Sequence, residues 1–208
     1  RYPFVPAKTV IGNPALWEPH QNLPIAQRAH VILAVSRLVE SKDYPTLLHA
    51  FAQLKDRQDY ILKIAGDGPE RERFQDLARR LGIEKHVHWL GRCQDVKSLY
   101  QEARIFVLSS LREGFPNVLL EAMTMGCACI ATKCHQGFEE ILQHETQGIL
   151  VPMADVTALR DAMQRCIHSP ALQESLSVQA QRRSCDFSLP KIAKQWESVM
   201  KTVMDKKV

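Results

Sequence analysis

Short apolar runs alternate with amphipathic stretches along most of the chain. The runs that fit buried strands cover residues 31–35, 60–65, 87–90, 105–108, 128–131 and 148–151. Helical spacing of apolar positions covers about residues 44–55, 70–81, 96–102, 116–125, 138–142, 156–167, 171–184 and 190–203. Strands that are apolar throughout indicate a parallel sheet covered on both faces. The pattern therefore predicts a doubly wound, Rossmann-like α/β domain.

Residues 1–30 do not follow this alternation. We interpret them as a linker with one short strand at Val10 and Ile11, closed by the turn residues of 12–14. The domain itself is expected to cover residues 31–208. Because the chain begins at Arg1, we expect it to be a piece of a longer protein.

Composition narrows the class of protein. A chain of 208 residues with 45% hydrophobic residues can bury one sizeable core. The net charge of +4 is mild, and no basic stripe with interleaved aromatic residues predicts a nucleic-acid partner. The sequence has no signal peptide or membrane-spanning run, although a basic face that docks on an anionic membrane stays open. Six cysteines without a C-x-x-C pair indicate buried reduced thiols in the cytosol, and no metal site is expected.

Ligands of an open α/β sheet bind beyond the carboxyl ends of the strands, so the loops there carry the candidate chemistry. Arg37 and Lys42 follow the first strand, and a helix start follows the fourth. Two cations beside the open N–H groups of a helix start would bind a pyrophosphate. The alternative, that both are solvated surface charges, stays open. The dinucleotide motif G-x-G-x-x-G and the Walker motif are absent, which argues against a nicotinamide or P-loop protein.

Two glutamates, Glu113 and Glu121, flank the predicted helix start. Eight residues of helix span about 12 Å, whereas the paired carboxylates of a glycosidase lie roughly 5–9.5 Å apart. We therefore interpret them as two walls of a ligand cradle; two solvated glutamates on an amphipathic helix are the alternative. Histidine spacing does not indicate a metal site, but His135 lies in a rim loop and is a candidate for ligand contact.

Six stretches, in the same order, resemble the motifs of glycosyltransferase family 4, also called group 1. They are S-R-L-V-E-S-K-D at 36–43, I-A-G-D-G-P-E at 64–70, V-H-W-L-G at 87–91, the E-x7-E segment at 113–122, A-T-K-C-H-Q-G-F-E-E-I-L at 131–142, and G-I-L-V-P at 148–152. The resemblance extends over about residues 10–200. It implies the C-terminal, donor-binding half of a two-domain GT-B enzyme.

The resemblance also implies an activity. The expected enzyme is a retaining, metal-independent glycosyltransferase that moves a hexose or N-acetylhexosamine to a glycan or glycolipid, as in polysaccharide or lipopolysaccharide biosynthesis. The expected donor is a UDP-sugar, with a GDP-sugar next, and no cofactor is needed. The acceptor would bind a domain outside this chain, so the chain alone should be inactive. The expected location is the cytoplasm, with the inner face of the membrane as an option.

Residue roles follow from the matched motifs. Arg37 and Lys42 would hold the donor diphosphate, Glu113 would contact the donor sugar, and Glu121 would accept hydrogen bonds from the ribose. The remaining members of the expected substrate site are the backbone of Phe115, Asn117 and Val118 for sugar and phosphate, the backbone near Arg92 and Cys93 for the base, and the rim residues Gly66 and His135.

The sequence departs from the family pattern at two places. Asp43 replaces the usual glycine after the lysine, and His135-Gln136 replaces a commoner small pair near the sugar. The second change leaves recognition of the donor sugar undecided. A non-catalytic nucleotide-sugar-binding subunit that needs a partner chain is the alternative function.

Overall fold

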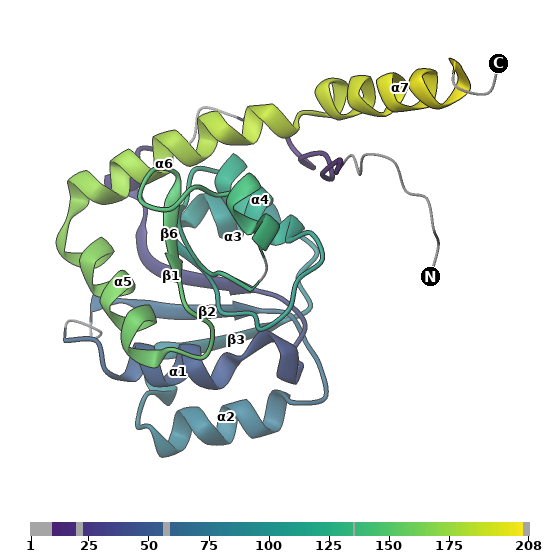
Figure 1. Cartoon of the computed structure of the whole chain (residues 1–208). Coiled ribbons are helices and arrows are strands. Elements are labelled where there is room, and N and C mark those ends of the chain that lie inside the picture. Colours follow the sequence, from purple (N-terminus) through teal and green to yellow (C-terminus); the bar gives the residue numbers. More distant parts are fainter. Residues whose placement is uncertain (1–9, 20–22, 56–58, 135, 206–208) are drawn as a thin grey trace.

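The sheet has the predicted doubly wound topology. The computed structural model describes residues 10–19, 23–55, 59–134 and 136–205. Its six strands are β1 (Ala29–Val35), β2 (Ile61–Ala65), β3 (Val87–Gly91), β4 (Ala103–Leu108), β5 (Ala128–Thr132) and β6 (Gly148–Val151). They form one parallel sheet in the order β3-β2-β1-β4-β5-β6 (Figure 1). The predicted α/β class and all six predicted strands are confirmed.

Helices cover both faces of this sheet (Figure 1). They are α1 (Tyr44–Ala52), α2 (Arg71–Arg80), α3 (Val96–Glu102), α4 (Asn117–Thr124), α5 (Val156–His168), α6 (Pro170–Ser184) and α7 (Leu189–Asp205). Apolar residues of α1, α2 and α5 belong to one core cluster, and those of α3 and α4 belong to a second. Helix α6 contributes to both clusters, with Leu176 in the first and Ala180 in the second.

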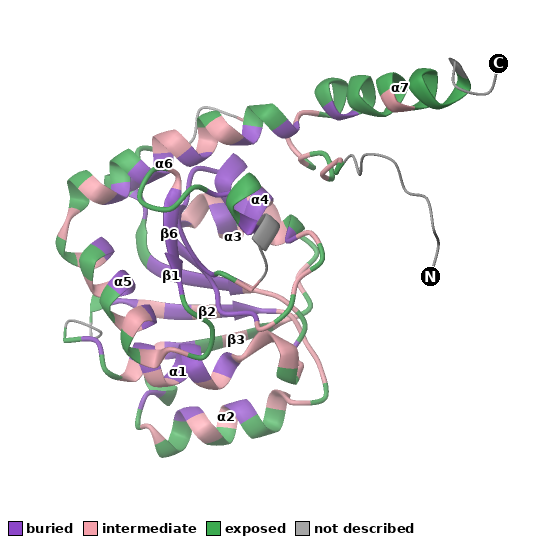
Figure 2. Ribbon diagram, in the orientation of Figure 1, coloured by how far each residue is buried: buried purple, intermediate pink, exposed green. Residues whose placement is uncertain are grey.

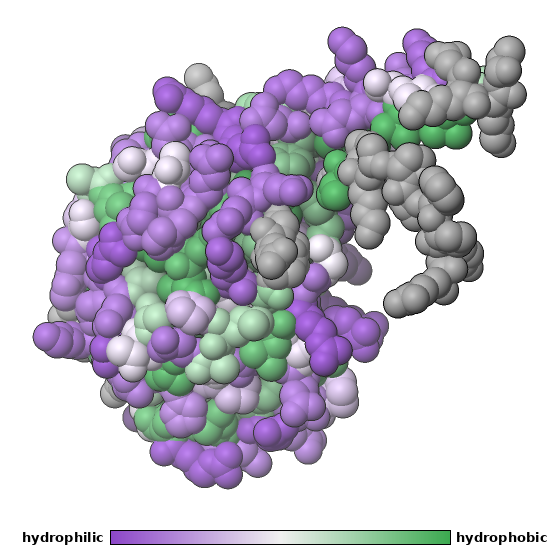
Figure 3. Space-filling view, viewed as in Figure 1, coloured by the Kyte–Doolittle hydropathy of each residue, from purple (hydrophilic) through white to green (hydrophobic). Residues whose placement is uncertain are grey.

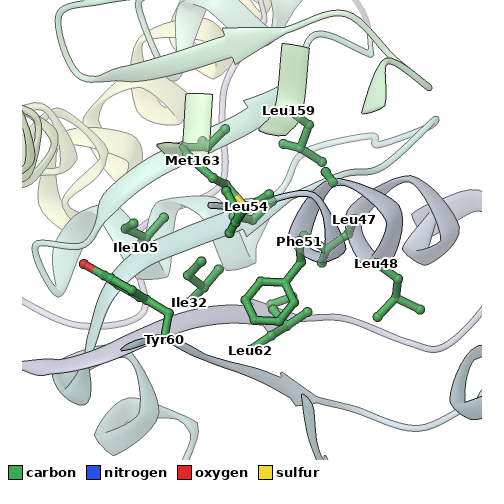
Figure 4. Packing of buried hydrophobic residues seen from close by; sticks show 14 of the residues in the cluster. Ile32, Leu47, Leu48, Phe51, Leu54, Tyr60, Leu62, Ile105, Leu159 and Met163 are labelled. Carbon is green, nitrogen blue, oxygen red and sulfur yellow. The ribbon is translucent and has the colours of Figure 1, made fainter. Parts of the chain in front are cut away.

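Successive residues of the central strands point into opposite cores. Ile32 belongs to the cluster under α1 and α5, whereas Leu33 belongs to the cluster under α3 and α4. Figure 4 shows Phe51 of α1 and Met163 of α5 approaching Ile32 from their own side of the sheet. Strands β5 and β6 are buried along their whole length, whereas the edge strand β3 has exposed residues (Figure 2). Burial on two faces explains why strands such as β4 and β5 are nearly continuous apolar runs rather than alternating ones.

The N-terminal segment corrects one prediction, because residues 10–14 form no strand. The apolar run is only two residues long, and Pro14 has no N–H to donate to a ladder. Ile11, Ala15 and Trp17 instead pack against the core under α3 and α4. The Ala15 amide also donates to the Phe187 carbonyl at 2.7 Å. The segment is thus a strap across the domain surface, not an added strand.

Arg28 lies in the segment interpreted as a linker, yet its side chain is buried, with 5% of its surface exposed. Its guanidinium donates to the carbonyls of Leu23 at 3.1 Å, Ala103 at 3.2 Å and Met125 at 2.9 Å. Ala103 and Met125 are the C-caps of α3 and α4. A helix leaves its last carbonyls without partners and carries partial negative charge there, so a buried cation satisfies both needs.

Two helix predictions also need correction. Helix α1 ends at Ala52 instead of residue 55, because the amides of Gln53 and Leu54 bond three residues back and tighten the last turn. The short helix predicted at 138–142 is a 3₁₀ helix, η5 (Gln136–Glu140). The other helix boundaries agree with the predictions to within about two residues, the margin normal for helix ends.

Helix α7 extends away from the sheet (Figure 1) and presents apolar side chains to solvent. Trp196, Met200 and Val203 are each about half exposed and lie on neighbouring turns. Figure 3 shows hydrophobic surface gathered along one side of this helix. Across the described ranges, none of the helices combines the length and the apolar content that a membrane span requires.

The structure explains the aspartate that replaces the usual glycine after Lys42. Asp43 has φ 47° and ψ 48°, in the left-handed region that favours glycine. Its Oδ1 accepts the Thr46 amide at 3.3 Å and caps α1, whereas its Oδ2 is buried without a hydrogen-bond partner among the described residues. The cap therefore offsets two penalties, left-handed strain and an unpaired oxygen.

We predict that Asp43→Gly changes the free energy of unfolding by about 0.5 kcal/mol or less, since glycine loses the cap but relieves the strain. Asp43→Ala should destabilise by about 1–2 kcal/mol, because it loses the cap and keeps the strain. Denaturant titration followed by circular dichroism measures both. Asp95 is the matched control, since it caps α3 at φ −100° and glycine relieves no strain there. Equal losses for glycine and alanine at position 43 would contradict the account.

Candidate active site

An ion pair lies where the sheet reverses its order. Strands β1 and β4 are neighbours, and their loops are the point at which doubly wound sheets open a ligand crevice. Lys42 follows β1 and Glu113 follows β4, and Lys42 Nζ lies 2.6 Å from Glu113 Oε1. The side chains are 20% and 10% exposed, so both charges are largely shielded from water. The structure thus brings together two of the three predicted catalytic residues.

Further hydrogen bonds hold the two loops in register. Ser110 Oγ donates to Glu113 Oε1 at 2.7 Å, so that carboxylate oxygen accepts two bonds. Ser109 Oγ donates to the Lys42 carbonyl at 2.8 Å, and the Leu111 amide donates to the Ser41 carbonyl at the same distance. Hydrogen bonds within and between the two loops therefore hold both side chains of the ion pair in place.

The third predicted catalytic residue, Arg37, lies in a neighbouring hollow. This hollow has a volume of about 460 Å³ and opens beyond the ends of β1, β2 and β3. Its walls include four predicted residues, Arg37, Gly66, Arg92 and Cys93. Both arginines are exposed, so two guanidinium groups border a space of a size suited to a small ligand. Cationic walls of this kind suit an anion.

Gly66 has a structural role at the floor of this hollow. Its φ of +135° is accessible to glycine, and a Cβ there would lie 1.8 Å from the Ser36 carbonyl oxygen. The Gly66 amide donates to the Gly91 carbonyl at 2.7 Å. The loops after β1, β2 and β3 can therefore approach one another only because this residue has no side chain.

The start of α4 has fewer open N–H groups than predicted. The Asn117 amide donates to the Phe115 carbonyl at 2.9 Å, and the Leu119 amide donates to Pro116 at 2.9 Å. The side chain of Phe115 lines a separate cavity of about 430 Å³, and Val118 packs against the core. Asn117 is exposed, and its Oδ1 accepts a bond from Asn13 Nδ2 at 2.9 Å. The helix start is partly satisfied by its own loop.

Glu121 lies farther along α4 and has a buried partner. Tyr100 of α3 donates its hydroxyl to Glu121 Oε2 at 2.8 Å. Burial raises the pKa of the Glu121 carboxyl, and the bond from Tyr100 opposes that rise. Glu121 also lines a hollow of about 370 Å³ together with Asn117 and with residues 13, 14 and 16 of the N-terminal segment.

The thiols fall into two groups, and all six cysteines are free. Cys127, Cys129 and Cys166 are buried, and burial raises the pKa of Cys127 and of Cys166 to about 12. Cys134 is partly buried, and its thiol pKa is raised by burial and by the nearby Glu113 carboxylate. Cys93 is also partly buried and Cys185 is exposed, so the prediction of buried thiols holds for only half of the set.

Three contributors to the site were not predicted. Ser110 resembles any strand-end serine, Tyr100 occupies an apolar position of an amphipathic helix, and Asn13 lies in the segment interpreted as a linker. Nothing in the spacing of these residues distinguishes them from structural ones. The predicted residue His135 lies outside the described residues.

The parallel sheet, with a charged pair at its switch point and a cationic hollow beside it, has the architecture of a Rossmann-like domain. Residues 17–183 match the model of the family described as glycosyl transferases group 1. The chain belongs to this family, and its fold is that of the C-terminal half of a GT-B glycosyltransferase, as the sequence predicted.

Named relatives agree with this assignment. An uncharacterized glycosyltransferase of Haemophilus influenzae is 30% identical over 91% of this chain and 54% of its own length. A Campylobacter jejuni N-acetylgalactosaminyltransferase, whose name gives an undecaprenol-diphosphate-linked glycan, is 29% identical over 82% of this chain and 47% of its own. The structure of Anabaena HepE with UDP and glucose matches with a TM-score of 0.78 and 25% identity, over 86% of this chain and 50% of HepE. The chain thus spans about half the length of these relatives.

We predict that Gly66→Ala destabilises the domain by roughly 2–4 kcal/mol, because it combines a backbone clash with a strained φ. Gly114→Ala is the matched control, since a Cβ there meets no atom within 4 Å. It should change the free energy of unfolding by about 0.5 kcal/mol or less. Denaturant titrations measure both, and similar values for the two variants would show that the loops do not need the close approach at Gly66.

Proposed function

We propose that this chain is the donor-binding half of a retaining, metal-independent glycosyltransferase. The observation that carries the proposal is the Lys42–Glu113 pair at the switch point, next to a hollow bordered by Arg37 and Arg92. A nucleoside diphosphate would place its base in the hollow and its phosphates beside Arg37 and Lys42. This arrangement suits a diphosphate because both cations follow β1 at the same end of the sheet.

The proposed chemistry depends on the leaving group. When the bond from the anomeric carbon to the diphosphate breaks, negative charge grows on the phosphate oxygens. Arg37 and Lys42 would stabilise that charge in place of a metal ion, as prearranged cations do. Glu113 Oε1 already accepts bonds from Lys42 and Ser110, which reduces its ability to attack carbon. The bonding supports a role for Glu113 in contacting the sugar, with the acceptor attacking from the same face as the leaving group.

The proposed donor is a UDP-sugar and the proposed acceptor is a glycan or glycolipid. HepE binds UDP and glucose, and the Campylobacter relative supports the acceptor class. The acceptor site would lie in a second domain, since the chain spans about half of its relatives. The exposed apolar residues of α7 support further protein there, because large apolar patches commonly mark interfaces. The acceptor side of the site would then be completed only in the full-length protein, with the cytoplasmic location expected from the sequence.

Calorimetric titration of the chain with UDP, GDP, ADP and NAD, first without magnesium and then with it, tests the proposal. We expect one nucleoside diphosphate to bind with the same affinity in both conditions, because the chain's own cations hold the phosphates. Binding of NAD alone would overturn the assigned ligand class. Binding that depends on magnesium would overturn metal independence.

We also predict that Arg37→Ala and Lys42→Ala each weaken UDP binding about tenfold or more, with little effect on uridine, since both residues contact phosphate. Lys63→Ala is the matched control, because Lys63 pairs with Glu102 at 2.7 Å away from the site and is similarly shielded. Turnover of the full-length enzyme should fall with the same two variants. Unchanged UDP affinity in both would show that these cations do not hold the diphosphate.

A further inference from the structure

The contact between Tyr100 and Glu121 joins two helices on the face that holds the second core. Tyr100 lies in α3 with no exposed surface, and its hydroxyl is 2.8 Å from Glu121 Oε2. Glu121 is on α4 and is only partly buried. A fully buried donor therefore reaches a carboxylate that faces the surface. Such a contact fixes the direction of the carboxylate as well as its distance.

The Tyr100 ring cannot turn away from this contact without disturbing its neighbours. Trp17 packs edge-on against it at a centroid distance of 6.0 Å, and Phe106 packs at 5.7 Å. The Tyr100 carbonyl accepts the Cys127 thiol at 3.2 Å and Arg28 Nη1 at 3.5 Å. Aromatic contacts on the ring and polar contacts on the backbone thus fix the position of the hydroxyl.

We propose that Tyr100 is a positioning residue, which orients the Glu121 carboxylate so that Oε1 is presented to the ribose hydroxyls of the bound nucleotide. The inference rests on the proposed function, since it concerns the same donor site. Glutamate has three rotatable side-chain bonds, and α4 fixes only its backbone. The bond from Tyr100 holds one oxygen in place and leaves the other for the ligand.

The protonation states agree with this role. Burial raises the pKa of Tyr100 well above its ordinary value, so the hydroxyl stays a donor at neutral pH. The same bond opposes the rise that burial gives to the Glu121 pKa, so it favours the ionised carboxylate. Tyr100 is the titratable group that contacts Glu121 among the described residues; Asn13, Asn117 and residues 14 and 16, which share its hollow, carry no charge.

Tyr100→Phe tests the inference, because it removes the hydroxyl and keeps the ring. The variant should bind UDP about three- to tenfold more weakly and bind 2′,3′-dideoxy-UDP as tightly as the parent chain. If GDP is the diphosphate that binds, the same comparison uses GDP and its dideoxy form. In a Glu121→Ala background, Tyr100→Phe should have no further effect. Tyr60→Phe is the matched control, since this buried hydroxyl contacts Gln173 at 3.4 Å, away from the site.

The outcomes distinguish failure of the inference from failure of the proposed function. If the parent chain binds none of the diphosphates, the proposed function fails and the inference fails with it. If the parent binds UDP and Tyr100→Phe binds it equally well, only the inference is overturned. Equal losses for UDP and its dideoxy form would indicate a general disturbance of the fold, which also overturns it.

A carbon-13 NMR titration of the Glu121 carboxyl gives a readout that needs no ligand. The bond from Tyr100 stabilises the ionised carboxylate, so its removal should shift the titration of Glu121 to higher pH. Tyr60→Phe should leave this titration unchanged. A curve that does not move in Tyr100→Phe would mean that the hydroxyl does not stabilise the carboxylate, and would refute the positioning role.

Discussion

A buried cation that donates to backbone carbonyls joins two of the helices beside the candidate site. Arg28 bonds to the C-caps of α3 and α4, and burial lowers the pKa of its guanidinium. The desolvation is offset because the carbonyls at two helix ends would otherwise be unpaired in the same space. Helix α3 carries Tyr100 and α4 carries Glu121, so the spacing of that pair depends on how Arg28 joins the two helices.

The strand order has a comparable effect on the charged pair. Because β1 lies beside β4 in the sheet, the loops that follow these two strands begin next to each other. They then lead to helices on opposite faces of the sheet, which leaves a crevice between the loops. Lys42 and Glu113 are 71 residues apart in the sequence, yet they meet because these loops start from neighbouring strands. The strand order thus brings the two loops together, and the residue types at these positions then determine the charge of the proposed site.

The sequence predicted the structure correctly where the local pattern of apolar and polar residues matches the burial of those residues in the fold. Apolar runs such as 105–108 became buried strands, and the loops after the strands carry Lys42, Glu113 and Arg37 as expected. It was uninformative where a polar group is buried by distant parts of the chain. Arg28 looks like a linker cation, because the carbonyls that it meets in and after α3 and α4 lie 72 or more residues away. Tyr100 looks like a core aromatic, because its carboxylate partner lies 21 residues away. Local spacing carries no signal for such pairs.

The left-handed turn at Asp43 has a consequence for how this loop can change during evolution. Aspartate and glycine codons differ by a single base, as in GAT and GGT, so one substitution connects the residue present here with the one usual in the family. Glycine adopts φ 47° without strain, and aspartate offsets the strain by capping α1. Alanine is also one base away from aspartate, but it has neither advantage. Position 43 can therefore change between aspartate and glycine in one mutational step, while the backbone that carries Lys42 stays the same.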